Sequence, residues 1–319
     1  MINISEKLKI KLKQIPMKPG IYKMVDSKNN IIYVGKSKCL SKRVKTYFAD
    51  NPKWEKVNKM VHLIDDIEFI VTDTHLEARL LECSLIKQIQ PIFNSQMKND
   101  RGYVYLKLEN YNRYKVLSVV DSREENTFGP FRKRFHLNEV INSFKNLYPI
   151  LKSGDTYSFE YHLFPVNMNV DVFNDNRISL EEILSSDACS NLFVKELKTR
   201  MKKEASFNNF EMASLYKNIM DNIIYIKYSI NKYIELIKND VLLTIPVDDG
   251  YKLFYVSKGK IIKKKIYEKL SQTDIEIFSE AALTVQDTPL NMDEKSYIDF
   301  RDILCSEIIS LSESMVKII

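Results

Sequence analysis

The stretch GIYKMVDSKNNIIYVGKSKCLSKRVKTYF, residues 20–48, decides the fold of this chain. Two runs rich in β-branched and aromatic residues flank its polar segment Asp26–Asn30. Strand-forming runs on either side of a short polar turn are typical of a β-hairpin. Each predicted strand carries a tyrosine, Tyr22 or Tyr33, close to a glycine. Taken alone, this pattern predicts an ordinary hairpin with two packed tyrosines.

The second strand leads into a basic segment, Lys36–Tyr47, which contains no acidic residue. From Cys39 onward its spacing predicts a helix, which places Arg43 and Tyr47 one turn apart on one face. A solvated basic helix is the simplest interpretation of this segment by itself. A lysine and an arginine beside a hairpin that carries two phenols are, in combination, suited to a phosphodiester group. The combination therefore predicts a phosphodiester site.

A further helix is predicted from Thr74 to Gln90, and Pro91 ends it. Thr74 with Glu77 three residues later matches a capping box, which is a sufficient explanation for Glu77. Glu82 differs, because its neighbours one turn away are apolar and it therefore lies on the apolar stripe. A buried carboxylate needs a cation or a hydrogen-bond donor. The sequence thus leaves two alternatives for this residue. It is either a metal ligand or a structural acid, which pairs with a buried cation such as an arginine or reaches solvent from the edge of the stripe.

The gap-free run Tyr33–Phe48 resembles the GIY-YIG nuclease superfamily, and within it the N-terminal nuclease domain of the UvrC family. Further stretches are similar to the same family: the helix that contains Glu82, the segment Pro91–Asn94 that follows it, and Phe128–Phe131. The resemblance covers residues 14–150. It implies an α+β fold whose N-terminal domain is a small antiparallel sheet with flanking helices.

The resemblance also implies metal-dependent hydrolysis of a phosphodiester. In this chemistry Tyr33 is the candidate general base, with its pKa lowered by Lys36. Arg43 binds the scissile phosphate through its planar guanidinium group. Glu82 binds a single divalent ion, Mg²⁺ or Mn²⁺. Which tyrosine takes the proton stays open at this point.

The predicted catalytic residues are Tyr22, Tyr33, Lys36, Arg43, Tyr47 and Asn94, and the predicted metal ligand is Glu82. In this set Tyr22 and Tyr47 order water and phosphate, while Asn94 supports the catalytic face. The predicted DNA-binding residues are Lys38, Lys42, Lys45, Lys98 and Arg101.

Residues 191–238 have helical spacing throughout, with a break at Asn208-Asn209 that predicts an antiparallel helix pair. Phe210–Ile219 resembles the UVR motif, through which the UvrC family docks on UvrB. UvrB is therefore the predicted partner of this hairpin. The Arg-Asp pair of the motif is replaced here by Tyr216-Lys217. A hairpin that only packs on its neighbours is accordingly an equal alternative.

The four cysteines stand singly, and residues 148–188 contain none. UvrC proteins commonly carry a cysteine cluster in this region, so we predict that this chain holds no iron–sulfur cluster. The 319-residue chain has a formal net charge of +6, which is compatible with nucleic acid as a ligand. The absence of a signal segment and of a long apolar run predicts a cytoplasmic bacterial protein with no membrane partner.

The rest of the chain supports a coarser description. Residues 151–185 are predicted to form aromatic-rich strands and a variable connection, and three strands with two helices are predicted after residue 239. The predicted domains are a GIY-YIG nuclease domain at 1–107, a UvrC-like extension and connector at 108–190, a UVR-like hairpin at 191–238 and a small C-terminal α/β unit at 239–319.

The leading hypothesis is a metal-dependent endonuclease of nucleotide excision repair that acts on damaged double-stranded DNA. Its length is similar to that of the short UvrC homologues such as Cho, which implies incision on the 3′ side of a lesion. One alternative is a structure-specific or mobile-element GIY-YIG nuclease, against which Phe128–Phe131 and the UVR-like hairpin argue. The other is a non-catalytic DNA-binding or partner-recruiting relative. The presence of Arg43 and Glu82 argues against it.

Overall fold

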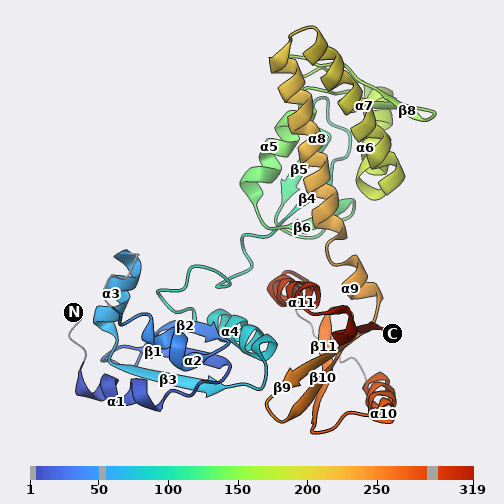
Figure 1. Cartoon of the computed structure of the whole chain (residues 1–319). Helices are drawn as coiled ribbons and strands as arrows, with labels where there is room; N and C mark the ends of the chain where they lie inside the picture. The colour runs from blue at the N-terminus through green and yellow to red at the C-terminus, as the bar shows by residue number, and fades with distance from the viewer. Residues whose placement is uncertain (1–4, 50–54, 286–293) are drawn as a thin grey trace. The chain divides into compact units, whose positions relative to one another are not determined.

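A computed structural model of the chain describes residues 5–49, 55–285 and 294–319 (Figure 1). The chain forms two compact units. The first combines residues 1–100 with 235–319, and the second consists of residues 101–234. The predicted four-part division is finer than this and stays a prediction.

The first unit begins with a three-stranded antiparallel sheet, in which β1 (Gly20–Val25) lies between β2 (Ile31–Ser37) and β3 (Asp66–Val71). The predicted hairpin is confirmed. Its turn is held by Asp26, whose carboxylate accepts hydrogen bonds from the backbone N–H groups of Lys28 and Asn30. The flanking helices are α1 (Glu6–Gln14), α2 (Leu40–Lys45), α3 (Glu55–Leu63) and α4 (His75–Ile89).

The first unit also contains a second antiparallel sheet, built by the C-terminal part of the chain. Its strands are β9 (Val241–Val247), β10 (Gly250–Ser257), β11 (Lys260–Tyr267) and β12 (Val316–Ile318), in the order β11-β10-β9-β12. Its helices are α10 (Gln272–Leu283) and α11 (Ile298–Ser310). The three predicted strands are confirmed, whereas β12 was not expected. Leu76 and Cys83 of α4 share a hydrophobic core with Leu243 and Phe254, so this sheet packs on the helix that carries Glu82.

The second unit has a sheet of β4 (Val104–Leu108), β5 (Leu117–Val120) and β6 (Thr127–Phe131), with β4 in the middle. The remaining elements are α5 (Arg134–Lys145), β7 (Leu151–Ser153), β8 (Thr156–Ser158), α6 (Val170–Ser185), α7 (Asp187–Ser206) and α8 (Phe210–Asn231), and α9 (Ile234–Lys238) spans the boundary between the units. Figure 1 shows α7 and α8 side by side as the expected antiparallel pair. One hydrophobic core joins this pair to α5, α6 and the sheet.

The expectation of strands and a variable connection over residues 151–185 is wrong for its second half, which is the helix α6. Asn169 caps the helix by accepting from the backbone N–H of Val172. The buried side chains of α6 include Asn176 and Ser179, two residue types that interrupt an apolar pattern. The helix stripe was therefore not apparent in the sequence.

Along the described ranges, no helix is both long and apolar enough to cross a membrane.

Candidate active site

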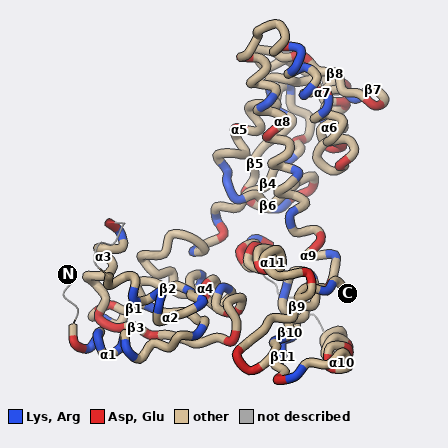
Figure 2. Tube along the Cα trace, viewed as in Figure 1, with Lys and Arg blue, Asp and Glu red and all other residues tan. Residues whose placement is uncertain are grey.

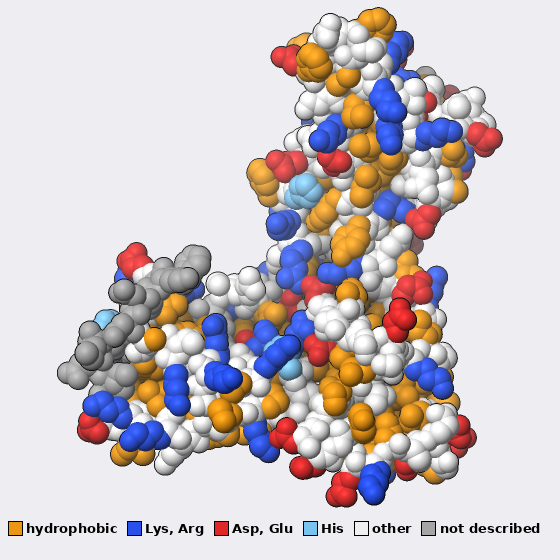
Figure 3. Space-filling model, viewed as in Figure 1, with side chains coloured by type: hydrophobic (Ala, Val, Ile, Leu, Met, Phe, Trp, Pro, Cys, Tyr) orange, Lys and Arg blue, Asp and Glu red, His pale blue; other side chains and the backbone are white. Residues whose placement is uncertain are grey.

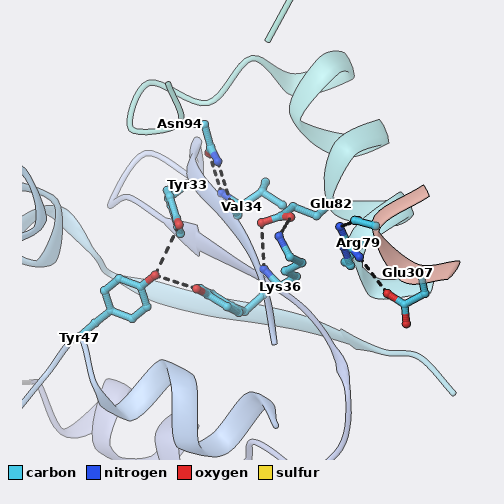
Figure 4. Close-up of polar contacts among 10 residues, drawn as sticks. Tyr33, Val34, Lys36, Tyr47, Arg79, Glu82, Asn94 and Glu307 are labelled. Carbon is cyan, nitrogen blue, oxygen red and sulfur yellow. Dashed lines mark hydrogen bonds and ion pairs between the residues drawn. The ribbon is translucent and has the colours of Figure 1, made fainter. Parts of the chain in front are cut away.

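Three tyrosines meet on one face of the β1–β2 hairpin. The Tyr22 and Tyr47 hydroxyl oxygens lie 2.7 Å apart in a hydrogen bond, and Tyr47 donates to Tyr33 Oη at 3.5 Å (Figure 4). The three ring centroids lie 5.9–6.1 Å from one another. Tyr22 and Tyr47 are buried, whereas Tyr33 is partly exposed. Tyr33 is therefore the phenol that a ligand reaches most directly.

Gly35 makes room for this cluster. It lies opposite Tyr22 in the β1–β2 register, and a Cβ atom at this position would overlap the Tyr22 ring and hydroxyl. Any larger residue at this position would overlap Tyr22. Tyr22 belongs to a close-packed core and has little room to move aside, so its contact with Tyr47 would be disturbed. The glycine therefore permits the close approach of the two strands' side chains.

Arg43 joins the same cluster from α2. Its guanidinium carbon lies 5.2 Å from the centroid of the Tyr47 ring. The sequence placed Arg43 and Tyr47 one turn apart. The structure keeps them together although α2 ends at Lys45. The chain continues in a turn, in which the Tyr47 backbone N–H donates to Val44 O.

Glu82 of α4 is buried and is bound by Lys36 of β2. The Glu82 Oε2 atom lies 2.8 Å from Lys36 Nζ, and Glu82 Oε1 accepts from the Lys36 backbone N–H at 3.1 Å (Figure 4). Of the two side chains, Lys36 is 32% exposed and Glu82 only 11%. The Glu82 carboxylate therefore has a cationic partner, as one of the two alternatives requires. This partner is a lysine and not an arginine, and it can reach solvent, which leaves the carboxylate available to a metal ion.

Asn94 binds the outer edge of β2. Its Oδ1 accepts from Val34 N at 2.9 Å, and its Nδ2 donates to Val34 O at 2.8 Å. Since β2 is an edge strand, these two backbone groups have no neighbouring strand to pair with. The Asn94 amide takes that strand's place and fixes the segment between Tyr33 and Gly35.

A hollow of about 350 Å³ adjoins these groups. Tyr33, Lys36, Glu82 and Asn94 line it together with residues of α3 and the segment after α4. The hollow is thus shared by Glu82, the predicted metal ligand, Tyr33, the predicted base, and Asn94, which supports the strand between them. This arrangement can accept a small hydrated cation and a phosphate group.

The expected lowering of the Tyr33 pKa by Lys36 is not what the structure indicates. Burial raises the pKa of Tyr33, and so do the neighbouring Tyr47 and Glu82, while Arg43 is the cation that opposes them. Burial likewise raises the pKa of Tyr22 well above its usual value. The reason is that the Lys36 ammonium group is directed to Glu82 and not to a phenol. In this state Tyr22 and Tyr33 are neutral hydrogen-bonding groups.

The predicted DNA-binding residues fall into two groups. Lys38, Lys42 and Lys45 are exposed on or beside α2, and Lys98 is partly exposed after α4. The face shown in Figure 3 carries Lys and Arg side chains over this part of the first unit. Arg101 belongs to the second unit.

Sequence reasoning missed one ionic cluster on α4. Thr74 does cap α4, since its Oγ1 accepts from the Glu77 backbone N–H, but the Glu77 carboxylate is held by Lys252 at 2.7 Å and Lys264 at 2.6 Å. Lys252 also binds Asp73 at 2.5 Å. No local signal could reveal this cluster, because its lysines lie more than 170 residues further along the chain.

Two comparisons relate the sequence of this chain to known proteins. Residues 18–95 match the family model of the UvrC-like GIY-YIG domain. The chain is 31% identical over 283 residues to the UvrABC system protein C of Caldanaerobacter subterraneus subsp. tengcongensis, an alignment that covers 82% of this chain and 45% of the relative. For the UvrABC system protein C of Streptococcus agalactiae serotype III the identity is 30% over 277 residues, with 82% and 46% covered. The chain thus spans about half the length of the curated relatives it matches.

Among solved structures, the N-terminal GIY-YIG endonuclease domain of UvrC from Thermotoga maritima, bound to its catalytic magnesium ion, is 37% identical. The match covers 29% of this chain and all of that domain, with a TM-score of 0.27.

Proposed function

Because this chain belongs to the UvrC-type GIY-YIG family, we propose that its first unit is a divalent-metal-dependent endonuclease. It hydrolyses a phosphodiester bond of damaged double-stranded DNA in nucleotide excision repair, on the 3′ side of the lesion. The observation that carries the proposal is that Tyr33, Arg43 and Glu82 come from three separate elements and gather around one hairpin face.

The donor groups at Glu82 fit a magnesium or manganese ion. Mg²⁺ keeps several of its waters and is commonly held by only one or two carboxylates. Glu82 offers one carboxylate at the hollow, and Lys36 can withdraw toward solvent when a cation takes its place. Such an ion, when bound, relieves the negative charge of the phosphate and acidifies a bound water.

The chain's own residues bind and orient the substrate. Arg43 is exposed beside Tyr47, where its guanidinium group can bind two oxygens of the scissile phosphate. Tyr33 faces the hollow and is the candidate general base. Its neutral phenol would first have to lose a proton, which a divalent ion bound at Glu82 would favour, and the phenolate would then accept the proton of the attacking water. Tyr47 and Tyr22 extend the hydrogen-bond chain inward from Tyr33, which fixes the orientation of its hydroxyl group.

Incision of a duplex that carries one lesion tests this function. The wild-type chain, with and without UvrB, should cut the lesion-bearing strand in Mg²⁺ and not in EDTA. The Arg43→Ala variant should bind the same duplex without cutting it. Absence of cleavage by the wild type in Mg²⁺ with UvrB present would contradict the proposal.

UvrB is the proposed partner, through the tip of the α7–α8 hairpin. Phe207 and Phe210 at this tip are 69% and 66% exposed, an uncommon position for large apolar side chains. In contrast Tyr216, within the UVR-like segment, is buried in the hairpin's own core. The docking surface would therefore be the tip and not the whole motif.

A pull-down of UvrB tests this partner. Phe207→Ala combined with Phe210→Ala should lose UvrB, while Tyr228→Ala, which changes an equally exposed aromatic residue of α8, should retain it. Equal retention by both variants would place the contact elsewhere.

A further inference from the structure

A groove in the second unit has a lining unlike that of the active site. It has a volume of about 710 Å³. One side is formed by β5 and the residues before it, and the other by α5. Its lining residues are Tyr114, Lys115, Ser118, Val119, Arg134, Asn138, Ile141, Asn142, Lys145 and Pro165. The basic run that leads into α5 is visible in Figure 2.

The charge of this groove is positive and only partly balanced. Of its three cations, Arg134 is paired with Asp121. Lys115 and Lys145 form no ion pair among the described residues. Ser118, which lines the groove, donates a hydrogen bond to the carboxylate of Glu109. The groove thus offers two uncompensated ammonium groups to an anionic ligand.

Neutral donors accompany the two lysines. Asn138, Asn142 and Lys145 repeat at helical spacing and line the groove from α5. Within the described ranges, neither asparagine side chain forms a hydrogen bond to the protein. Amide and ammonium donors along one helix face match the regularly spaced oxygens of a phosphodiester backbone.

The rim adds a ring on which a base can stack. Tyr114 lines the groove and is 47% exposed. Base–aromatic stacking beside a positive groove is the usual way of holding a single strand without sequence preference. In a duplex the bases are already stacked in pairs, so this ring is of use only to an unpaired base.

We propose that the β5–α5 groove is a second DNA-binding site, which binds the backbone of a single-stranded segment and stacks one of its bases on Tyr114. The choice of DNA as the occupant rests on the proposed function. The site contributes affinity and takes no part in the chemistry of cleavage.

The test measures binding separately from cleavage. A labelled oligothymidine is titrated with the full chain carrying Arg43→Ala, in EDTA, by fluorescence anisotropy over a range of salt concentrations. On this background, Lys115→Glu with Lys145→Glu should weaken binding about tenfold or more at low salt, since two phosphate contacts are lost. The slope of log affinity against log salt should shrink by about 1.4, which is about 0.7 for each phosphate contact on a single strand.

Two further variants make the result specific. Lys198→Glu with Lys217→Glu changes the net charge of the same unit equally but on exposed positions of α7 and α8, and should leave the slope unchanged. Tyr114→Ala should weaken binding without changing the slope, because it removes stacking and no charge. Lys115→Gln with Lys145→Gln repeats the test without introducing acid.

The outcomes separate this site from the proposed cleavage. Equal losses by the groove and control variants, or unchanged binding by the groove variants, would overturn the second site even if the wild type cuts DNA. Loss of single-strand binding confined to the groove variants would support it even if the wild type fails to cut.

Discussion

Glu77 and Glu82 lie on the same helix, and each is bound by a lysine that comes from a sheet. Glu82 pairs with Lys36 of the nuclease sheet, and Glu77 pairs with Lys252 of the C-terminal sheet. The two positions are five residues apart, a spacing that turns their side chains to different faces of α4. The same ion pair therefore occurs twice on one helix in two different surroundings.

The surroundings decide what each pair can do. Around Glu77, two carboxylates face two ammonium groups, because Asp73 and Lys264 complete the cluster. Lys252 is only 7% exposed and cannot leave for solvent. A cation would be repelled there, although a hollow adjoins the cluster. Glu82 has one partner that is one third exposed, and phenols and an arginine are close by. A carboxylate becomes a candidate metal ligand when its partner is able to leave.

The largest expected effect contrasts the two glutamates directly. Glu82→Gln should reduce cleavage about a thousandfold, since loss of the metal removes several kcal/mol of transition-state stabilisation. Its thermal stability in EDTA should change little, because the Lys36 ammonium group remains solvated. Glu77→Gln should keep the cleavage rate per folded molecule and lower the melting temperature. Nicking assays and melts of both variants make the measurement. Loss of cleavage by Glu77→Gln together with loss of stability by Glu82→Gln would contradict the roles assigned to the two glutamates.

Arg43→Ala should come next, with a loss of about 3 kcal/mol in transition-state stabilisation, or roughly a hundredfold in rate. DNA affinity should fall only modestly, because one phosphate contact among several is lost. Lys42→Ala, on the same helix, is the matched control and should leave the single-turnover rate near that of the wild type. A rate close to wild type for Arg43→Ala would remove this residue from the site.

Lys252→Met tests the structural pair. Removing one partner of a buried ion pair leaves the other charges uncompensated. The free energy of unfolding should fall by about 3 kcal/mol, the low end of the range for such pairs, because Lys264 still binds Glu77. Lys264→Met, on a side chain that is 54% exposed, should cost less than about 1 kcal/mol. Urea unfolding curves give both values. Equal costs for the two lysines would show that burial of Lys252 is not what matters.

The smallest expected effect is on the pH dependence of stability. Burial acts to raise the pKa of Glu77, but hydrogen bonds from Lys252 and Lys264 outweigh it and lower the pKa below its usual value of 4.5. The contribution to stability is thus present above about pH 4.5 and is lost as the pH falls through the lower, folded-state pKa. The free energy of unfolding of wild type should fall more steeply on acidification than that of Glu77→Gln. Parallel curves would contradict this origin of the acid sensitivity.

Much of the first unit followed from local pattern. The Asp26–Asn30 turn between two β-rich runs predicted the hairpin, and one helical turn brought Arg43 to Tyr47. The apolar neighbours of Glu82 predicted its burial. In each case the spacing of side chains along a strand or helix determines which face they share. The family resemblance of the same residues added their expected roles.

The partners were decided by tertiary structure alone. Lys36 binds Glu82 across 46 residues and not the phenol of Tyr33, and Lys252 reaches Glu77 across 175. The helix α6 and the strand β12 likewise depend on the surfaces they cover. Buried polar residues interrupt the apolar pattern of α6, and β12 is too short to show a pattern. Periodicity specifies which face a residue occupies. Only the packing of distant elements specifies what lies opposite that face, because contacts between distant segments leave no periodic trace in the chain.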